Sequence, residues 1–240
     1  MGIIIKGRTV FGPNIVTDGL VLYLDAANPK SYPGTGNTWY DISGFNNHGT
    51  MNNFIGSGPD ISSGYDSNTK YMMFDRHLGI GDGVSNNRVN FSSSSSLLDC
   101  YSENGVSIEL WLKIKTPVCT AITKMHGVWE IYYCSTLTHR TERTTGTTEL
   151  SSSLYNTTYT TFHNIIATHD GTNRKIFVNG IKIAEDVNIC TGQIFNALSL
   201  GGYSNGNYAF IGAMSIYRLY NRALADNEVL QNYNAFKSRF

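Results

Sequence analysis

Residues 210–240, FIGAMSIYRLYNRALADNEVLQNYNAFKSRF, decide the fold class of this chain. The first part, residues 210–220, is long and mostly apolar. Such a run is typical of a buried β-strand. Residues 221–224 then turn the chain, and an acidic, helix-like segment follows. The stretch therefore predicts one buried strand that is followed by one short helix.

The helix is expected over residues 226–236. Its apolar residues fall on one stripe that can lie on a sheet: Val229, Leu230, Tyr233 and Phe236. Asp226 and Glu228 fall in the first turn, where negative charge suits the helix dipole. Ala225 occupies the expected N-cap, a position that serine would stabilise better. The sequence thus predicts a helix whose apolar stripe covers one end of a sheet.

The composition is that of a single β-rich domain. The 240 residues are 41% apolar and 15% charged, with 24 glycines, 15 tyrosines and a net charge of zero. Sandwich domains often reach this length undivided. A neutral chain without basic clusters gives no reason to expect nucleic-acid binding, and no stretch approaches the ~18 apolar residues of a membrane span. We expect neither a nucleic-acid nor a membrane partner.

Several other segments are predicted to be strands. Residues 19–25 and 106–115 alternate between two kinds of side chain, so one face of each enters the core. The other face of residues 106–115 is expected to meet solvent or a partner. Residues 136–161, rich in Thr and Ser, are interpreted as a solvent-facing hairpin around Gly146, with low-complexity disorder as the alternative. In residues 162–186, two Gly-containing turns divide a three-stranded meander.

Three of these stretches resemble one known family. Residues 19–50 contain GLVLYLDA, SYPGTGNTWYDISG and NNHGT, residues 162–186 hold the meander, and residues 220–224 read YNRAL. Together they resemble the laminin-G-like, concanavalin-A-like domains of structural proteins in tailed-bacteriophage virions. The resemblance covers residues 20–237. It implies an all-β fold, a two-sheet antiparallel jelly-roll sandwich with one short C-terminal helix, over residues 20–240.

Residues 1–19 stand apart as an N-terminal arm. Apolar side chains are spread between glycines and a proline: Ile3, Ile4, Ile5, Val10 and Phe11. One hypothesis makes this arm an edge strand of the domain itself. The other makes it a docking arm that adds a strand to a neighbouring subunit, because an unpaired apolar edge is prone to aggregate.

The sequence offers no arrangement that is typical of catalysis. Glycoside hydrolysis needs two carboxylates separated by ~5–9 Å, and residues 106–115 carry only Glu109, while Glu130 and Glu149 are isolated in the sequence. No nucleophile elbow precedes any histidine, and no phosphate-binding loop occurs. His139, like three other histidines, falls in a predicted loop. We therefore expect a protein that is not an enzyme.

Two loops are candidates for binding. The segment YSNGNY provides aromatic platforms beside amides for a glycan: Tyr203, Asn205, Asn207 and Tyr208. Trp39 and Trp129 are assigned to the core, because tryptophan is usually well buried. A calcium ion, which prefers carboxylate and amide oxygens, has one candidate cluster: Asp75, Asp82 and Asn86. The alternative for that cluster is a set of ordinary turns, and we expect no other cofactor.

The four cysteines form no C-x-x-C motif: Cys100, Cys119, Cys134 and Cys190. A zinc or redox motif is therefore not indicated. The N-terminal apolar run is too short for a signal peptide. We expect reduced, mostly buried thiols, with two disulfides as the alternative.

The family resemblance and the lack of a catalytic pattern favour a structural function. The main hypothesis is a capsid decoration or head-fibre subunit on the surface of a phage virion, assembled in the host cytoplasm. Its partners would be other virion proteins of the capsid, neck or tail, or further copies of itself. The alternative is a tail-associated adhesin that binds host-surface glycans through its loop rim. Fold alone does not separate these functions.

Overall fold

The computed structural model describes residues 3–5, 8–10, 14–60, 63–78, 84–98, 105–115, 120–125, 129–134, 136–143, 146–152, 161–188, 197–203 and 208–240. Within these ranges, side chains are described everywhere except at residues 3–10, 76–78, 84–86, 98, 142, 143 and 146.

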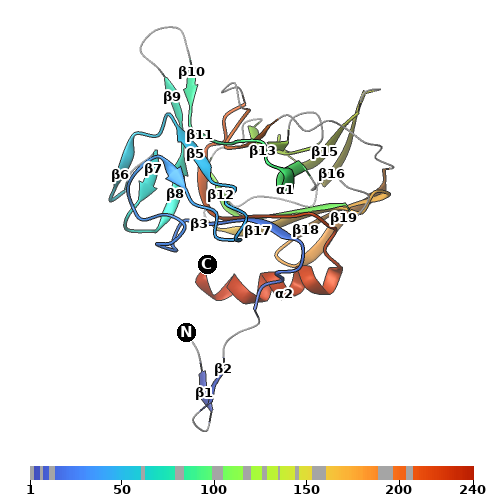
Figure 1. Ribbon diagram of the computed structural model, residues 1–240. Helices are drawn as coiled ribbons and strands as arrows, with labels where there is room; N and C mark the ends of the chain where they lie inside the picture. The colour runs from blue at the N-terminus through green and yellow to red at the C-terminus, as the bar shows by residue number, and fades with distance from the viewer. Residues whose placement is uncertain are drawn as a thin grey trace.

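Two large sheets face each other and form a sandwich (Figure 1). The first sheet consists of β3 (Leu20–Asp25), β6 (Gly56–Gly58), β7 (Gly64–Asp66), β8 (Tyr71–Phe74), β12 (Val106–Ile114), β17 (His163–His169), β18 (Asn173–Val178), β19 (Ile181–Val187) and β21 (Gly212–Tyr220). Its order is β19-β18-β17-β12-β21-β8-β7-β6, and β3 pairs with the C-terminal half of β21. All pairs are antiparallel except β6 with β7.

The second sheet has eight strands in the order β16-β15-β14-β13-β20-β11-β5-β4. They are β4 (Thr38–Trp39), β5 (Gly49–Asn52), β11 (Arg88–Phe91), β13 (Thr120–Met125), β14 (Trp129–Tyr133), β15 (Leu137–Arg143), β16 (Gly146–Ser152) and β20 (Leu198–Leu200). Every pair in it is antiparallel. The predicted two-sheet sandwich is therefore confirmed, and so is the meander of β17, β18 and β19. The hairpin of β15 with β16 is also present, but it is not wholly solvent-facing as predicted, because Leu137 and Leu150 are buried in the core.

The core lies between the sheets, where apolar side chains from both are almost completely buried. Leu22, Leu110 and Tyr217 enter it from the nine-stranded sheet, and Ile131 and Leu200 enter it from the eight-stranded sheet. Trp39 and Trp129 are buried there too, as predicted. Each of these side chains belongs to a strand whose neighbours in sequence point the other way. The outer faces of the two sheets are left to other residues.

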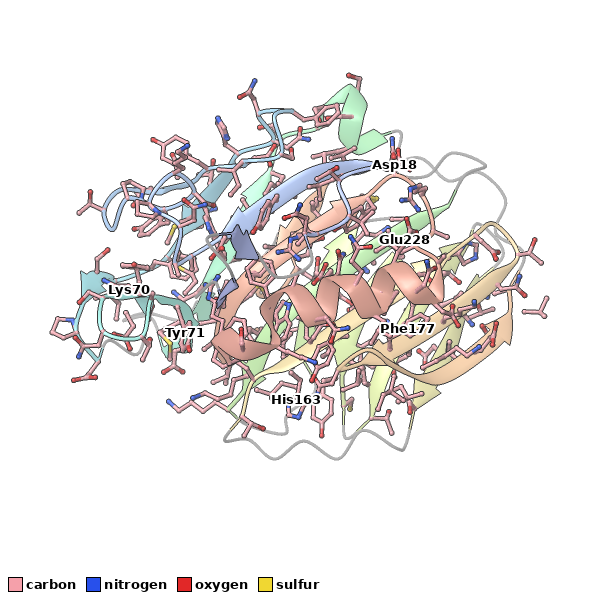
Figure 2. The ribbon with its side chains drawn as sticks, turned by 90° about the horizontal axis from the view of Figure 1, so that it is seen from below. Asp18, Lys70, Tyr71, His163, Phe177 and Glu228 are labelled. Atoms are coloured by element: carbon pink, nitrogen blue, oxygen red, sulfur yellow. The ribbon has the colours of Figure 1, made fainter. Side chains whose placement is uncertain are left out.

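The helix α2 (Asp226–Phe236) covers the outer face of the nine-stranded sheet (Figures 1 and 2). Its bounds agree with the prediction, but the predicted apolar stripe is wrong in one member. Leu230 is exposed, whereas the polar Asn232 is fully buried. The second face of β12, expected to meet solvent or a partner, is buried except at the half-buried Lys113, because Asn232 and Tyr233 of α2 contact Glu109 and Trp111.

The end of the chain completes this cover. A short 3₁₀ turn, η2 (Lys237–Arg239), follows α2. Arg239 donates to both carboxylate oxygens of Asp25 at 2.9 and 2.8 Å, and the ring of Phe240 stacks 4.5 Å from that of Trp111. At the other end of α2, Glu228 lies near Asp18 (Figure 2), and Arg222 binds both carboxylates. Ion pairs therefore lie at each end of the helix, to β3 through Asp25 and to the segments that flank β3 and β21 through Asp18 and Arg222.

Smaller elements complete the description. α1 (Ser95–Leu98) follows β11, and β9 (Arg76–Leu78) pairs with β10 (Val84–Asn86). In the arm, β1 (Ile3–Ile5) pairs with β2 (Arg8–Val10), and these two strands join neither large sheet. Phe11 lies outside the described residues. Docking of the arm on a neighbouring subunit stays a prediction. Among the helices of the described ranges, none has the length and hydropathy needed to cross a membrane.

Two expectations about single residues were wrong. His139 was assigned to a loop, but it lies in β15 and is fully buried, because the hairpin joins the eight-stranded sheet and its inner side faces the core. Cys134 was expected to be a reduced thiol, but it is disulfide-bonded. It follows β14 in a half-buried position rather than deep in the core. Cys100, Cys119 and Cys190 lie outside the described residues.

Candidate functional site

A pocket of about 360 Å³ lies on the outer face of the eight-stranded sheet. Its floor is formed by β13, β14, β15 and β16, and its wall by residues that follow β20. We call it the tyrosine pocket and define it by Glu130, Tyr132, Arg140, Glu149, Tyr203 and Tyr208. Ile131, between the first two, points into the core. Because successive side chains of a strand alternate between faces, Glu130 and Tyr132 point outward.

The strand register places four charged side chains in one row across the floor. Lys124 of β13 pairs with Glu130 of β14, Glu130 with Arg140 of β15, and Arg140 with Glu149 of β16. Arg140 donates to Oε1 of Glu149 from Nε at 3.0 Å and from Nη2 at 2.8 Å. Its Nη1 and the ammonium of Lys124 each lie 3.4 Å from Oε2 of Glu130. The row therefore alternates in sign, and its formal charge sums to zero.

Exposure increases along this row. The side chains of Lys124 and Glu130 are 7% and 3% exposed, whereas those of Arg140 and Glu149 are 26% and 40% exposed. One end of the row is thus sealed and the other end is open to a ligand. A ligand in the pocket would meet Glu149 and the edge of Arg140 first.

Tyrosine rings surround the charged row. Tyr203 donates from its hydroxyl to Oε2 of Glu130 at 3.2 Å, and the ammonium of Lys124 lies 4.3 Å from the centre of its ring. The rings of Tyr203 and Tyr208 are 4.8 Å apart. Tyr208 is 57% exposed, so it offers a free aromatic face at the rim. The guanidinium of Arg140 packs 4.6 Å from the ring of Tyr132.

The backbone of Tyr208 is held in an uncommon conformation. Its φ is 55°, in the left-handed region that bulky residues seldom adopt. Its carbonyl accepts hydrogen bonds from the N–H of Ala121 at 3.0 Å and the hydroxyl of Thr120 at 3.4 Å. Strained backbone of this kind is found preferentially at functional sites. The strand β13 thus fixes the backbone of Tyr208 at the edge of the pocket.

The pKa values reflect the position of each group. Burial raises the pKa of Glu130, and the positive charges of Lys124 and Arg140 oppose this shift. Burial also acts to raise the pKa of Glu149, but hydrogen bonds from Tyr132 and Arg140 outweigh it and the pKa is lowered. Burial raises the pKa of Tyr203, so its hydroxyl remains a donor at neutral pH.

The structure brings together two of the residues that the sequence proposed for glycan binding. Tyr203 and Tyr208 line the same pocket. Asn205 and Asn207 lie outside the described residues. The sequence reasoning missed the charged row, because it treated Glu130 and Glu149 as isolated. Arg140 connects them, and the hairpin around residues 143–146 was the signal that could have placed Arg140 beside Glu149.

The calcium prediction remains untested. Asp75 lies 3.8 Å from the ammonium of Lys115, and its N–H donates to the side chain of Asn87. Asp82 lies outside the described residues, and Asn86 is in β10 without a described side chain. Within the described part of the chain, no group of three or more His, Cys, Asp or Glu is placed to hold a metal ion.

Glu109, the carboxylate considered for catalysis, has no access to a substrate. It is fully buried beneath α2, with Oε1 lying 3.0 Å from the guanidinium of Arg218. Trp111 and Asn164 also donate to Oε1, and Asn232 of α2 donates to Oε2. This carboxylate is therefore part of the structural attachment of the helix.

Comparison with known proteins supports the fold assignment. Residues 82–230 match the family model Laminin_G_3, described as the concanavalin A-like lectin/glucanases superfamily. No curated protein matches the chain. Among solved structures, the chain is similar to a botulinum neurotoxin type C domain, in a study of cell entry that depends on two ganglioside molecules. The identity is 14% and the TM-score 0.61, over 92% of this chain and 52% of that chain.

Two further structures show the same fold. The binding domain of botulinum neurotoxin DC, solved with rat synaptotagmin II, has 14% identity and a TM-score of 0.63 over 92% of this chain and 52% of that chain. Domain 4 of AbnA, an extracellular GH43 arabinanase from Geobacillus stearothermophilus, was solved with arabinotriose. It has 14% identity and a TM-score of 0.58 over 89% of this chain and 98% of that chain. The chain spans about half the length of the toxin domains.

Proposed function

The chain belongs to the concanavalin A-like lectin/glucanases superfamily, and on that premise we propose that it is a carbohydrate-binding module without catalytic activity that holds a glycan in the tyrosine pocket. One observation carries the proposal: the exposed Tyr208 lines the same pocket as the partly exposed pair of Arg140 and Glu149. The pocket thus combines an apolar platform with a small number of placed polar groups, as ligand sites commonly do.

The chemistry of this pocket suits a sugar. The C–H face of a pyranose or furanose ring packs on an aromatic ring, and its hydroxyl groups donate to carboxylates. Tyr208 supplies the platform and Glu149 supplies the acceptor. Among the similar structures, one domain was solved with arabinotriose and another concerns gangliosides. These relatives support a glycan ligand for this chain, while their identity of 14% transfers no residue role.

A glycan array followed by titration tests the proposal. The chain should bind some glycans saturably, and Tyr208→Ala should weaken the best of them about tenfold or more, which corresponds to a loss of about 1.4 kcal/mol. Tyr40→Ala is the matched control, because Tyr40 is also an exposed tyrosine, at 41%, and lies outside the pocket. Equal loss in both variants, or no saturable binding at all, would overturn the proposal.

The hypothesis of a virion subunit stays a prediction. The similar structures described above are toxin domains and an arabinanase domain, which support the glycan-binding alternative better than capsid decoration. If the chain is displayed on a particle, the arm formed by β1 and β2 is the segment proposed to attach it. Deletion of residues 1–18 should then release the protein from purified particles, and retention of the truncated chain would contradict that role.

A further inference from the structure

We infer, on the basis of the proposed function, that the tyrosine pocket selects uncharged glycans and discriminates against glycans whose terminal sugar carries a carboxylate or sulfate. The charges of the pocket are distributed unevenly between its sealed end and its open end. This distribution determines which class of glycan the pocket accepts.

Arg140 is already neutralised by two carboxylates. Three of its N–H groups donate to oxygens of Glu149 and Glu130, at 2.8 to 3.4 Å. One face of its guanidinium is covered by the ring of Tyr132. Recognition of an acidic sugar usually requires an arginine that offers a bidentate pair of donors to the ligand. Arg140 presents that pair, Nε and Nη2, to Glu149 instead.

Lys124 is not accessible to a ligand. Its side chain is 7% exposed, its ammonium lies 3.4 Å from Glu130, and the ring of Tyr203 lies 4.3 Å from it on the pocket side. An anionic ligand would have to displace Tyr203 to reach this charge. The second cation of the pocket is therefore as unavailable as the first.

The most exposed charge in the pocket is negative. Glu149 is 40% exposed, against 26% for Arg140, and hydrogen bonds hold its pKa below the usual range. Apart from the buried Glu130, the remaining described lining residues carry no charge, and Thr136, Ser151 and Tyr208 among them offer neutral hydroxyls. A sugar hydroxyl can donate to Glu149 at no electrostatic cost. A carboxylate or sulfate in the same place would face a like charge, which is disfavoured at an interface.

Matched glycan pairs test the inference with the full chain. We would titrate a neutral galactose-terminated oligosaccharide, its sialylated counterpart and its sulfated counterpart at neutral pH. The neutral member should bind at least about tenfold more tightly than either acidic member. The difference should shrink as salt is added, because screening weakens exposed charges.

Glu149→Gln is the informative variant, since it removes the charge but keeps the shape. The preference for the neutral oligosaccharide over the acidic ones should become smaller or reverse in this variant. It should persist in Glu185→Gln, a control at a carboxylate that is 42% exposed on β19, outside the pocket. Tighter binding of an acidic member by the unaltered chain would overturn the inference and leave the proposed function intact. Absence of binding to every glycan would instead overturn the proposed function. A preference that Glu149→Gln leaves unchanged would also overturn the inference.

Discussion

The two outer faces of the sandwich carry the same kind of ion pair in opposite settings. On the nine-stranded sheet, Glu109 and Arg218 lie side by side on β12 and β21, 3.0 Å apart and fully buried under α2. On the eight-stranded sheet, Arg140 and Glu149 lie side by side on β15 and β16, 2.8 Å apart and partly exposed. The difference is the cover. One face is closed by the chain's own helix, and the other is left open.

The closed pair is surrounded by groups of this chain, although Nε and Nη1 of Arg218 have no hydrogen-bond partner among the described residues and Nη1 meets Glu109 only as an ion pair. Arg218 lies between the rings of Tyr23 and Phe236, at 4.4 and 4.6 Å, and Asn232 of α2 donates to Glu109 at 2.9 Å. The open pair has one exposed edge and an exposed tyrosine beside it. The comparison therefore indicates that an acid–base pair on this fold holds the structure where it is covered and is available for binding where it is not.

Breaking the closed pair should have the largest effect on stability. Arg218→Met leaves Glu109 buried without its counterion, and the loss of one partner of a buried pair typically costs about 3–5 kcal/mol. Urea unfolding should show this loss as a lower midpoint with an unchanged slope. The double variant Glu109→Gln with Arg218→Met should recover part of it, because it removes the uncompensated charge and keeps a side-chain oxygen that accepts hydrogen bonds. A single variant as stable as the unaltered chain would contradict a structural role for the pair.

The sequence predicted the cover of the closed face but not its attachment. The bounds of α2 and the strand beneath it follow from local patterns, namely an apolar run, a turn and acidic residues in the first helical turn. The buried contact of Asn232 with Glu109 does not, because those two residues are 123 positions apart in the chain. The buried carboxylate of Glu109 needs hydrogen-bond donors, and the fold brings Asn232 to it. The polar Asn232 therefore faces the sheet, although the periodicity of the helix favours Leu230 for that side.

The inner side of the open sheet offers a second test. His139 is the neighbour of Arg140 on β15, but it points into the core, and neither ring nitrogen has a partner among the described residues. Burial holds its pKa well below the usual range, and the charge of Arg174 adds to this effect. The unfolded chain therefore binds a proton below pH ~6.5 that the folded chain does not bind. The free energy of unfolding should therefore fall by up to about 1.4 kcal/mol for each pH unit below ~6.5.

His139→Leu should remove this part of the acid sensitivity. Urea unfolding at a series of pH values from neutral to mildly acidic would measure it. We expect a smaller fall in the free energy of unfolding for the variant, while His169, whose pKa is also lowered by burial, still contributes to the remaining slope. An identical slope in both proteins would show that His139 is protonated or solvated in the folded state. The proposed binding of glycans on the other side of β15 should not change.

The open face was harder to predict than the closed one. A hairpin around Gly146 was expected, but the observed register pairs Arg143 with Gly146 and thereby puts Arg140 opposite Glu149. A small change in the position of the turn would separate these two residues. Tyr203 reaches Glu130, 73 positions away in the chain, because β20 lies beside β13, a pairing that no local pattern specifies. The aromatic residues of the loop could be recognised from the sequence as a binding candidate. The charged row beneath them could be recognised only from the sheet topology.

A single substitution at the N-cap of α2 should stabilise the helix that covers the closed face. Ala225 is the N-cap of α2, with an extended conformation and no side-chain cap, and its N–H donates to Glu228 at 2.9 Å. Ala225→Ser would supply the missing acceptor for the first turn and should raise the free energy of unfolding by about 1 kcal/mol. Thermal unfolding measures the gain. Ala223→Ser, in the preceding turn, is the control. An equal change in both would show that the serine acts other than as a cap.

The open pair should contribute least to stability. Glu149 is more than a third exposed, and exposed ion pairs contribute only about 0–1 kcal/mol. Glu149→Gln should therefore change the free energy of unfolding by less than about 0.5 kcal/mol in urea, far less than Arg218→Met. The same variant should alter the preference between neutral and acidic glycans. A large loss of stability in Glu149→Gln would place the open pair in the same structural class as the closed one. A small loss with altered binding would mean that the row from Lys124 to Glu149 is kept in order by its sealed end, and that its exposed end is free to serve a ligand.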